Sequence, residues 1–219
     1  MPLPGSGRPA QDFDDDDKRE MLRRYGRRLA RMGHCGAHLG EISLRIGPDA
    51  FLTHRDSAFR PALNPTDLVV VQAGKVSGSA AVGPMARIHE AIYQAHDWVN
   101  GMITAAPDYL LGLCAAHRRL DTHVIPESYM VLDDVPMLPV SSLQDPQAIA
   151  ARITRENTVL MIENVGIIVA SASLYKAFDK MEVARYTAQA VQQAQLLGGV
   201  VPIEQEEIGK IRSFFGVHS

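Results

Sequence analysis

The sequence has few cysteines and no excess of basic residues. Its 219 residues include only Cys35 and Cys114, too few for a disulfide scaffold, which favours a reducing compartment and predicts a cytoplasmic location. The chain has 22 lysines and arginines against 25 acidic residues, so its net charge is −3. This balance predicts neither nucleic acid nor an anionic membrane as a partner.

Long apolar runs are also missing. No stretch approaches the roughly 18 apolar residues of a membrane span, and the N-terminus lacks the apolar segment of a signal peptide. Hydrophobic residues still make up 46% of the chain, enough for one full core. We therefore expect a flexible tail over residues 1–18 and a single globular domain over residues 19–219.

The acidic run at residues 14–17, followed by Lys18, has two interpretations. It resembles an enteropeptidase recognition site, and it equally suits the start of a helix, where the helix dipole favours acidic side chains. Residues 19–32 then place apolar side chains on one stripe, which predicts an amphipathic helix that ends at Gly33.

The rest of the sequence alternates between strand and helix patterns. The expected strands cover residues 41–46, 50–54, 68–72, 98–105, 158–164 and 166–171. The expected helices cover residues 84–95, 107–117, 145–155 and 173–197, and most of the chain between 119 and 145 is expected to form loops and short strands. Adjacent hairpins with interspersed helices predict an α/β fold, a three-layer α/β/α sandwich around a largely antiparallel sheet.

The order of these segments resembles the class II aldolase/adducin family. The similar motifs are GEISLR (40–45), FLT (51–53), LNPTDLVVV (63–71), IHEAIY (88–93), PDYLLGLCA (107–115) and ENVGIIVASASLYKAFDKMEVARYTAQA (163–190). The resemblance runs from about Arg19 to about Leu197. It implies the aldolase fold and a homo-oligomer, most commonly a tetramer whose sites lie between neighbouring subunits.

The family's reaction depends on a zinc ion held by three histidines. The resemblance places two of these, from a His-x-His motif, on Ile103 and Ala105, and the third, from an Asn-His-Gly turn, on Val165. None of these side chains binds a metal, so we expect no zinc and no other cofactor. The acid/base glutamate of the family falls on Met85.

The family's phosphate-holding residues are replaced as well. Two serines fall on Gly83 and Pro84, and the Gly-Asn-Ile-Ser motif becomes Gly40-Glu41-Ile42-Ser43. A negative charge at Glu41 near the phosphate position argues against a sugar-phosphate substrate.

Several polar residues come from segments that border the family's cleft. The candidate pocket residues are Glu41, His54, Arg55, His89, Tyr109 and Glu163. Histidine titrates near neutral pH and arginine binds carboxylates with two hydrogen bonds, so this set predicts a small carbonyl or carboxylate ligand. The alternative interpretation of His54-Arg55-Asp56 is a solvated charged turn.

Two further clusters have a functional and a structural interpretation. His34-Cys35-Gly36-Ala37-His38 offers ligand-type side chains for a relocated metal site, although its glycines favour a flexible connection. Glu127 and Tyr129 form an acid and a hydroxyl donor at a subunit boundary, or else belong to a loop stiffened by Pro126.

Three functions follow. The first is a divergent lyase-type enzyme without the usual zinc, the second is a non-catalytic binding or assembly module like the adducin head, and the third is the ordinary metal-dependent aldolase.

Overall fold

A computed structural model describes residues 15–35 and 40–215 of the chain. The strands are β1 (Glu41–Gly47), β2 (Ala50–His54), β3 (Leu68–Gln72), β4 (Lys75–Val76), β5 (Gly101–Ala105), β6 (Met137–Leu138), β7 (Val159–Ile162) and β8 (Gly166–Ser171). The helices are α1 (Asp15–Arg31), α2 (Ala86–Ala95), α3 (Asp108–Ala115), α4 (Pro126–Leu132), α5 (Pro146–Ala150), α6 (Leu174–Leu196) and α7 (Gln205–Phe215), with short 3-10 helices η1 (Arg60–Ala62), η2 (Pro65–Asp67) and η3 (Val140–Gln144).

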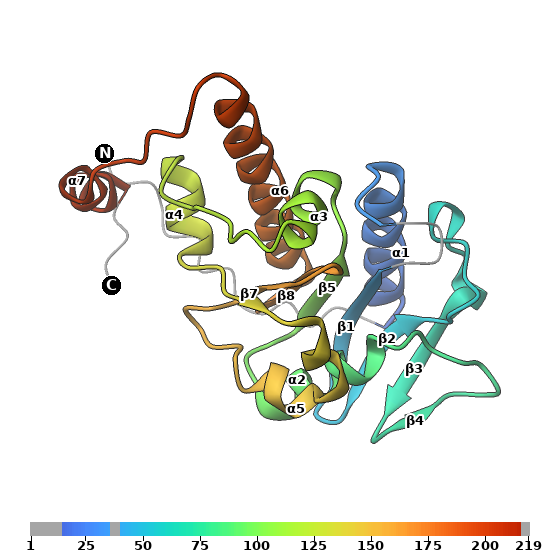
Figure 1. Cartoon of the computed structure of the whole chain (residues 1–219). Coiled ribbons are helices and arrows are strands. Elements are labelled where there is room, and N and C mark those ends of the chain that lie inside the picture. The colour runs from blue at the N-terminus through green and yellow to red at the C-terminus, as the bar shows by residue number, and fades with distance from the viewer. Residues whose placement is uncertain (1–14, 36–39, 216–219) are drawn as a thin grey trace.

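The strands form one sheet in the order β4-β3-β2-β1-β5-β8-β7-β6. Only the short β6–β7 pair is parallel among these strands; each of the others runs antiparallel to its neighbours. Helices α1, α3, α4 and α6 cover one face of the sheet, and α2 and α5 cover the other (Figure 1). The predicted three-layer α/β/α sandwich with a largely antiparallel sheet is therefore confirmed.

The two faces of the sheet bury different side chains, as the period-2 alternation of a strand requires. On β5, Ile103 and Ala105 pack with the helices α1, α3 and α6. Met102, from the same strand, packs with α2 and α5. We call these two sides the α1/α6 face and the α2/α5 face.

Most predicted elements match the observed ones, and four regions differ. Helix α1 begins at Asp15 instead of Arg19, so residues 15–17 of the acidic run form its first turn; the rest of the predicted tail lies outside the described residues. Helix α5 ends at Ala150, short of the predicted residue 155. Helix α7 was not predicted.

The prediction of a loop at residues 125–129 was wrong. Pro126 occupies the first turn of helix α4, where its missing N–H costs no hydrogen bond. Ser128 lies 2.8 Å from Thr187 of α6, and Glu127 accepts a hydrogen bond of 2.6 Å from Tyr186. Glu127 and Ser128 thus belong to the packing of α4 on α6, and Tyr129 is buried beside the ring of His123.

None of the helices in residues 15–35 and 40–215 combines the length and apolar character needed to cross a bilayer.

Candidate functional site

The positions that the family resemblance assigns to zinc ligands lie at the end of β5 and in the β7–β8 turn. Ile103 and Ala105 are buried in the core of the α1/α6 face, with 0% and 2% of their surface exposed. Val165 is half-buried and packs on the α2/α5 side. The backbones meet closely, because a β-carbon on Gly166 would lie 2.2 Å from the Ala105 carbonyl oxygen.

The side chains at these positions do not fit a metal ion. Isoleucine, alanine and valine carry no donor atom, whereas zinc takes nitrogen, sulfur or oxygen ligands. In the part of the chain that the structure describes, no group of three or more histidine, cysteine or acidic side chains is arranged to hold a metal. The side chains at positions 103, 105 and 165 therefore supply no ligand for zinc.

Gly83 and Glu41 lie at positions that the family resemblance assigns to phosphate-holding residues, and they fit each other sterically. A β-carbon at position 83 would lie 2.7 Å from Glu41 Oε2, closer than van der Waals contact allows. The Glu41 carboxyl is 3% exposed, and its other oxygen accepts a hydrogen bond from the Thr53 hydroxyl. The absent side chain of Gly83 thus leaves the space that the Glu41 carboxyl fills.

Glu41 and His54 form a buried pair with shifted pKa values. His54 Nε2 lies 3.8 Å from Glu41 Oε1, and His54 is fully buried. Burial raises the pKa of Glu41 to about 7, against the opposing effects of the Thr53 hydrogen bond and the Arg60 charge. Burial and Arg60 lower the pKa of His54 to about 4. At neutral pH His54 is therefore neutral and Glu41 is partly protonated.

His89 lies at the centre of a hydrogen-bonded network on the α2/α5 face. Its Nδ1 is 2.7 Å from Ser43 Oγ, and its Nε2 is 2.8 Å from Thr104 Oγ1. Ser43 Oγ also lies 2.9 Å from the Tyr93 hydroxyl. Burial, followed by the nearby His54, lowers the pKa of His89 to about 3. A neutral imidazole with both nitrogens occupied is a structural residue, so His89 has no nitrogen left for substrate.

Three of the predicted pocket residues make contacts elsewhere. Arg55 Nε donates to Asp67 Oδ1 at 2.9 Å. Glu163 Oε1 lies 3.7 Å from His117 Nδ1 on a partly exposed surface. Tyr109 is half-buried against the α1/α6 core. Of the predicted set, the structure brings Glu41 and His54 together. His89 lies near enough to His54 for that residue to affect its pKa.

The proposed metal turn at residues 34–38 is only partly described, since Gly36, Ala37 and His38 lie outside the described residues. His34 is buried, with its Nε2 2.6 Å from Glu182 Oε1, and burial lowers its pKa. Burial raises the pKa of the half-buried Cys35 thiol. These two side chains belong to the junction between α1 and α6.

Sequence reasoning missed the hydroxyl residues of this region, Ser43, Thr53 and Thr104. Each is a polar side chain at an inward-facing strand position, and each is 5% exposed or less. An inward polar residue requires a hydrogen-bond partner. That requirement was the available signal: the partner of Ser43 and Thr104 is His89 of α2, and the partner of Thr53 is Glu41.

Comparisons with known proteins agree with this architecture. Residues 20–191 match the family described as Class II Aldolase and Adducin N-terminal domain. No curated protein gives a match.

Several solved structures share the fold. YgbL from Klebsiella pneumoniae is 22% identical, with a TM-score of 0.79 over 91% of this chain and 100% of that chain. An L-fuculose 1-phosphate aldolase is 19% identical, with a TM-score of 0.77 over 93% and 98%. An aldolase II superfamily protein from Pseudomonas syringae is 17% identical, with a TM-score of 0.79 over 91% and 84%. Because the family match spans most of the domain, the chain belongs to the class II aldolase and adducin family.

Proposed function

We propose that this chain is a class II aldolase-family protein without zinc-dependent sugar-phosphate aldolase activity, and that it serves as a binding or assembly module. The observation that carries this proposal is the Glu41–Gly83 pair. The Glu41 carboxyl lies where the family resemblance places a substrate phosphate, and Gly83 lacks the hydroxyl that would bind it. A phosphate would have to displace a buried carboxyl and then lie beside its charge.

The ordinary metal-dependent aldolase has the least support. It needs three donors at positions occupied by Ile103, Ala105 and Val165, and two of these side chains are packed in the core. Loss of the imidazoles removes the cost of burying polar groups, which suits a stable domain without its metal.

Metal analysis and an aldol cleavage assay test this proposal. We expect protein purified without chelators to contain far less than one zinc per chain, and to leave L-fuculose 1-phosphate uncleaved when zinc is added. An L-fuculose 1-phosphate aldolase, prepared and assayed alongside, provides the positive control. Stoichiometric zinc together with cleavage of the sugar phosphate would overturn the proposal.

A divergent enzyme is the second candidate, and the Glu41–His54 pair favours it. A carboxyl with a pKa of about 7 is suited to general acid–base catalysis near neutral pH, and His54 Nε2 is close enough to influence it. The substrate class would be a small carbonyl or carboxylate compound. This candidate predicts turnover of a β-keto acid by decarboxylation, with loss of activity in both Glu41→Gln and His54→Ala. Absence of turnover, or turnover that both variants retain, would eliminate it.

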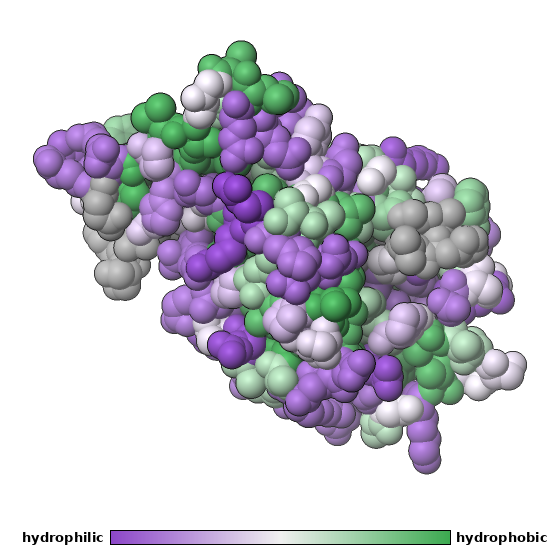
Figure 2. Space-filling model, in the orientation of Figure 1, coloured by the Kyte–Doolittle hydropathy of each residue, from purple (hydrophilic) through white to green (hydrophobic). Residues whose placement is uncertain are grey.

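The assembly role is supported by exposed apolar side chains. Leu196, Leu197 and Val201 are 82%, 87% and 88% exposed, at the end of α6 and in the segment that follows. Hydrophobic surface lies at this end of the molecule in Figure 2. Contiguous apolar surface commonly marks a protein–protein contact. We therefore propose a homo-oligomer, and by resemblance to the family a tetramer.

We also propose that the protein is located in the cytoplasm, where the free thiols of Cys35 and Cys114 would stay reduced.

A further inference from the structure

The solvent-exposed face of α1 separates its charges along the helix. The exposed charged residues of this helix are Asp16, Asp17, Glu20, Arg24, Arg28 and Arg31, and from Asp17 on they are three or four positions apart. Residues spaced in this way share one face of a helix. The acidic residues occupy the first half of that face and the arginines occupy the second half.

The arginines of the second half are only partly neutralised within the chain. Arg28 stacks over the Phe178 ring, 4.6 Å from its centroid, and Glu20 forms an ion pair with Arg23. Within the described residues, Arg24 and Arg31 have no carboxylate partner. Like charges one turn apart destabilise a helix, so an acidic partner on this face would stabilise it.

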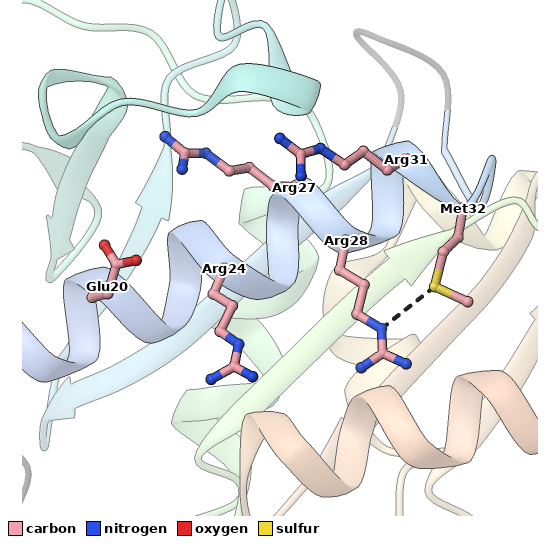
Figure 3. Close-up of a pocket in the computed structure, with 6 residues that line it drawn as sticks. All are labelled: Glu20, Arg24, Arg27, Arg28, Arg31 and Met32. Carbon is pink, nitrogen blue, oxygen red and sulfur yellow. Dashed lines mark hydrogen bonds between the residues drawn. The ribbon is translucent and has the colours of Figure 1, made fainter.

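The same arginines line a hollow on the surface of α1. It measures about 310 Å³ and is lined by Glu20, Arg24, Arg27, Arg28, Arg31 and Met32. Arg24 and Arg28 extend to one side of the helix, and Arg27 and Arg31 extend to the other (Figure 3). The hollow therefore presents arginine side chains along both of its edges.

We propose that this face binds the same face of a second copy of the chain, with the two α1 helices antiparallel. Glu20 and Arg24 lie at equal distances from Leu22 in the sequence, and so do Asp16 and Arg28. A two-fold axis on the exposed side of α1, at the level of Leu22 along the helix, consequently places Glu20 against the partner's Arg24 and Asp16 against the partner's Arg28. Each contact occurs twice, as in any two-fold interface.

This arrangement explains why acids and arginines are segregated on one helix. A parallel pair would set acid against acid and arginine against arginine, so the charges also select the orientation. The contact lies on α1, away from the apolar end of α6, and it is independent of the tetramer proposed above. The particle mass distinguishes them, because loss of the α1 contact halves the mass and leaves any other contact intact.

Charge exchange between two variants tests the proposal. Arg24→Glu/Arg28→Glu makes the face acidic, and Asp16→Arg/Glu20→Arg makes it basic. By sedimentation velocity at low ionic strength, we expect each variant alone to show about half of the wild-type particle mass. An equimolar mixture of the two is expected to recover the wild-type mass, because the acidic and basic faces complement each other.

Several controls separate this result from unfolding or a general charge effect. Arg24→Glu alone reverses one charge on the proposed face without removing an ion pair within the chain. Arg152→Glu makes the same charge reversal away from this face, at an exposed site after α5. Arg152→Glu should keep the wild-type mass, and all variants should unfold at similar temperatures. High salt should dissociate the wild-type contact, since about 0.1 M salt screens charges beyond ~10 Å.

Three outcomes would overturn the proposal. The first is a wild-type mass that corresponds to a monomer at low salt. The second is failure of the mixture to recover the wild-type mass. The third is tight binding of heparin through Arg24 and Arg28 with no change of mass in either double variant, which would assign the face to a polyanion.

Discussion

The two faces of β5 differ in polarity: one contributes to a buried hydrogen-bonded network and the other to an apolar core. Thr104 points to the α2/α5 face and bonds His89, which also meets Ser43 and through it Tyr93. Its neighbours Ile103 and Ala105 point to the α1/α6 face, into an apolar core. A single strand thus carries a complete polar network on one side and, on the other, apolar side chains at the positions that the family resemblance assigns to metal ligands.

The difference shows what a buried polar group requires. An imidazole is tolerated in the interior when both nitrogens have partners, as in His89. Histidines at 103 and 105 would need a metal to serve as their partner, and without it they would leave unsatisfied nitrogens in the core. Apolar side chains at these positions need no such partner.

Introducing histidines at positions 103, 105 and 165 should produce the largest effect. We expect Ile103→His/Ala105→His/Val165→His to lower the free energy of unfolding by about 5 kcal/mol in the presence of a chelator, through overpacking and unpaired nitrogens. Added zinc should recover part of that loss, because the ion binds only the folded state. Urea unfolding with and without zinc measures both quantities.

The matched variant Ile103→Gln/Ala105→Gln/Val165→Gln introduces polar side chains without imidazole ligands. It should be destabilised to a similar extent and should show no zinc response. Equal zinc responses in the two variants would mean that these positions do not converge on one site.

Removing His89 should have the next largest effect. We expect His89→Ala to destabilise the protein by about 4 kcal/mol, because it leaves a cavity and unsatisfied hydroxyls on Ser43 and Thr104. Tyr93→Phe removes only the outermost hydroxyl of the network and should cost about 1 kcal/mol. Thermal and urea unfolding of both variants would check the ratio. Equal losses of stability in the two variants would mean that His89 is not the main stabilising residue of this network.

Sequence pattern predicted most of the sheet and the long helices because these elements have their own signals. Alternating residues in 41–46 predict β1, and Ser173 before an apolar repeat predicts the start of α6. Helix α4 was missed because Pro126 was interpreted as a loop residue, although proline is equally common in a helix's first turn. Its helical state depends on packing against α6, which local sequence does not contain.

The candidate site was only partly predictable for a similar reason. Glu41 and His54 were identified because the family resemblance places their segments at the border of the cleft, and the pairing of β1 with β2 brings them together. The pairing of Arg55 with Asp67 depends on the 3-10 turn before β3, which turns that carboxylate toward the arginine. The contact between Glu41 and Gly83 joins positions 42 residues apart, and only the folded backbone shows that one makes room for the other.

Glu41 makes the α2/α5 side of the molecule sensitive to pH. Its pKa is about 7 in the folded chain and 4.5 by its ordinary value, so the folded state holds the proton more tightly. The contribution of Glu41 to the free energy of unfolding is fully present below pH 4.5, falls as the pH rises and is lost above pH 7. The whole change is about 3 kcal/mol. Glu41→Gln cannot acquire this charge. The free energy of unfolding of the variant, relative to that of the wild type, should therefore rise by about 3 kcal/mol between pH 4.5 and pH 8.

Urea unfolding across this range measures the difference, with the exposed Glu204→Gln as the reference variant. The histidines act in the opposite direction in both proteins. The pKa values of His54 and His89 are lowered to about 4 and about 3, so stability falls as pH drops below 6.5. A pH-independent difference between Glu41→Gln and the wild type would mean that Glu41 is not buried as a carboxyl.

The smallest effect concerns the steric fit of Glu41 and Gly83. We expect Gly83→Ser to destabilise the protein by about 2 kcal/mol, because its β-carbon would lie 2.7 Å from Glu41 Oε2. The carboxyl cannot simply swing away, since it is buried and bonded to Thr53.

Glu41→Asn/Gly83→Ser shortens the facing side chain and should recover at least half of that loss. A double-mutant cycle by urea unfolding at pH 8 isolates this coupling from the charge effect of Glu41→Asn alone. Strictly additive losses would show that the two positions vary independently, and the filled phosphate position would then need another explanation.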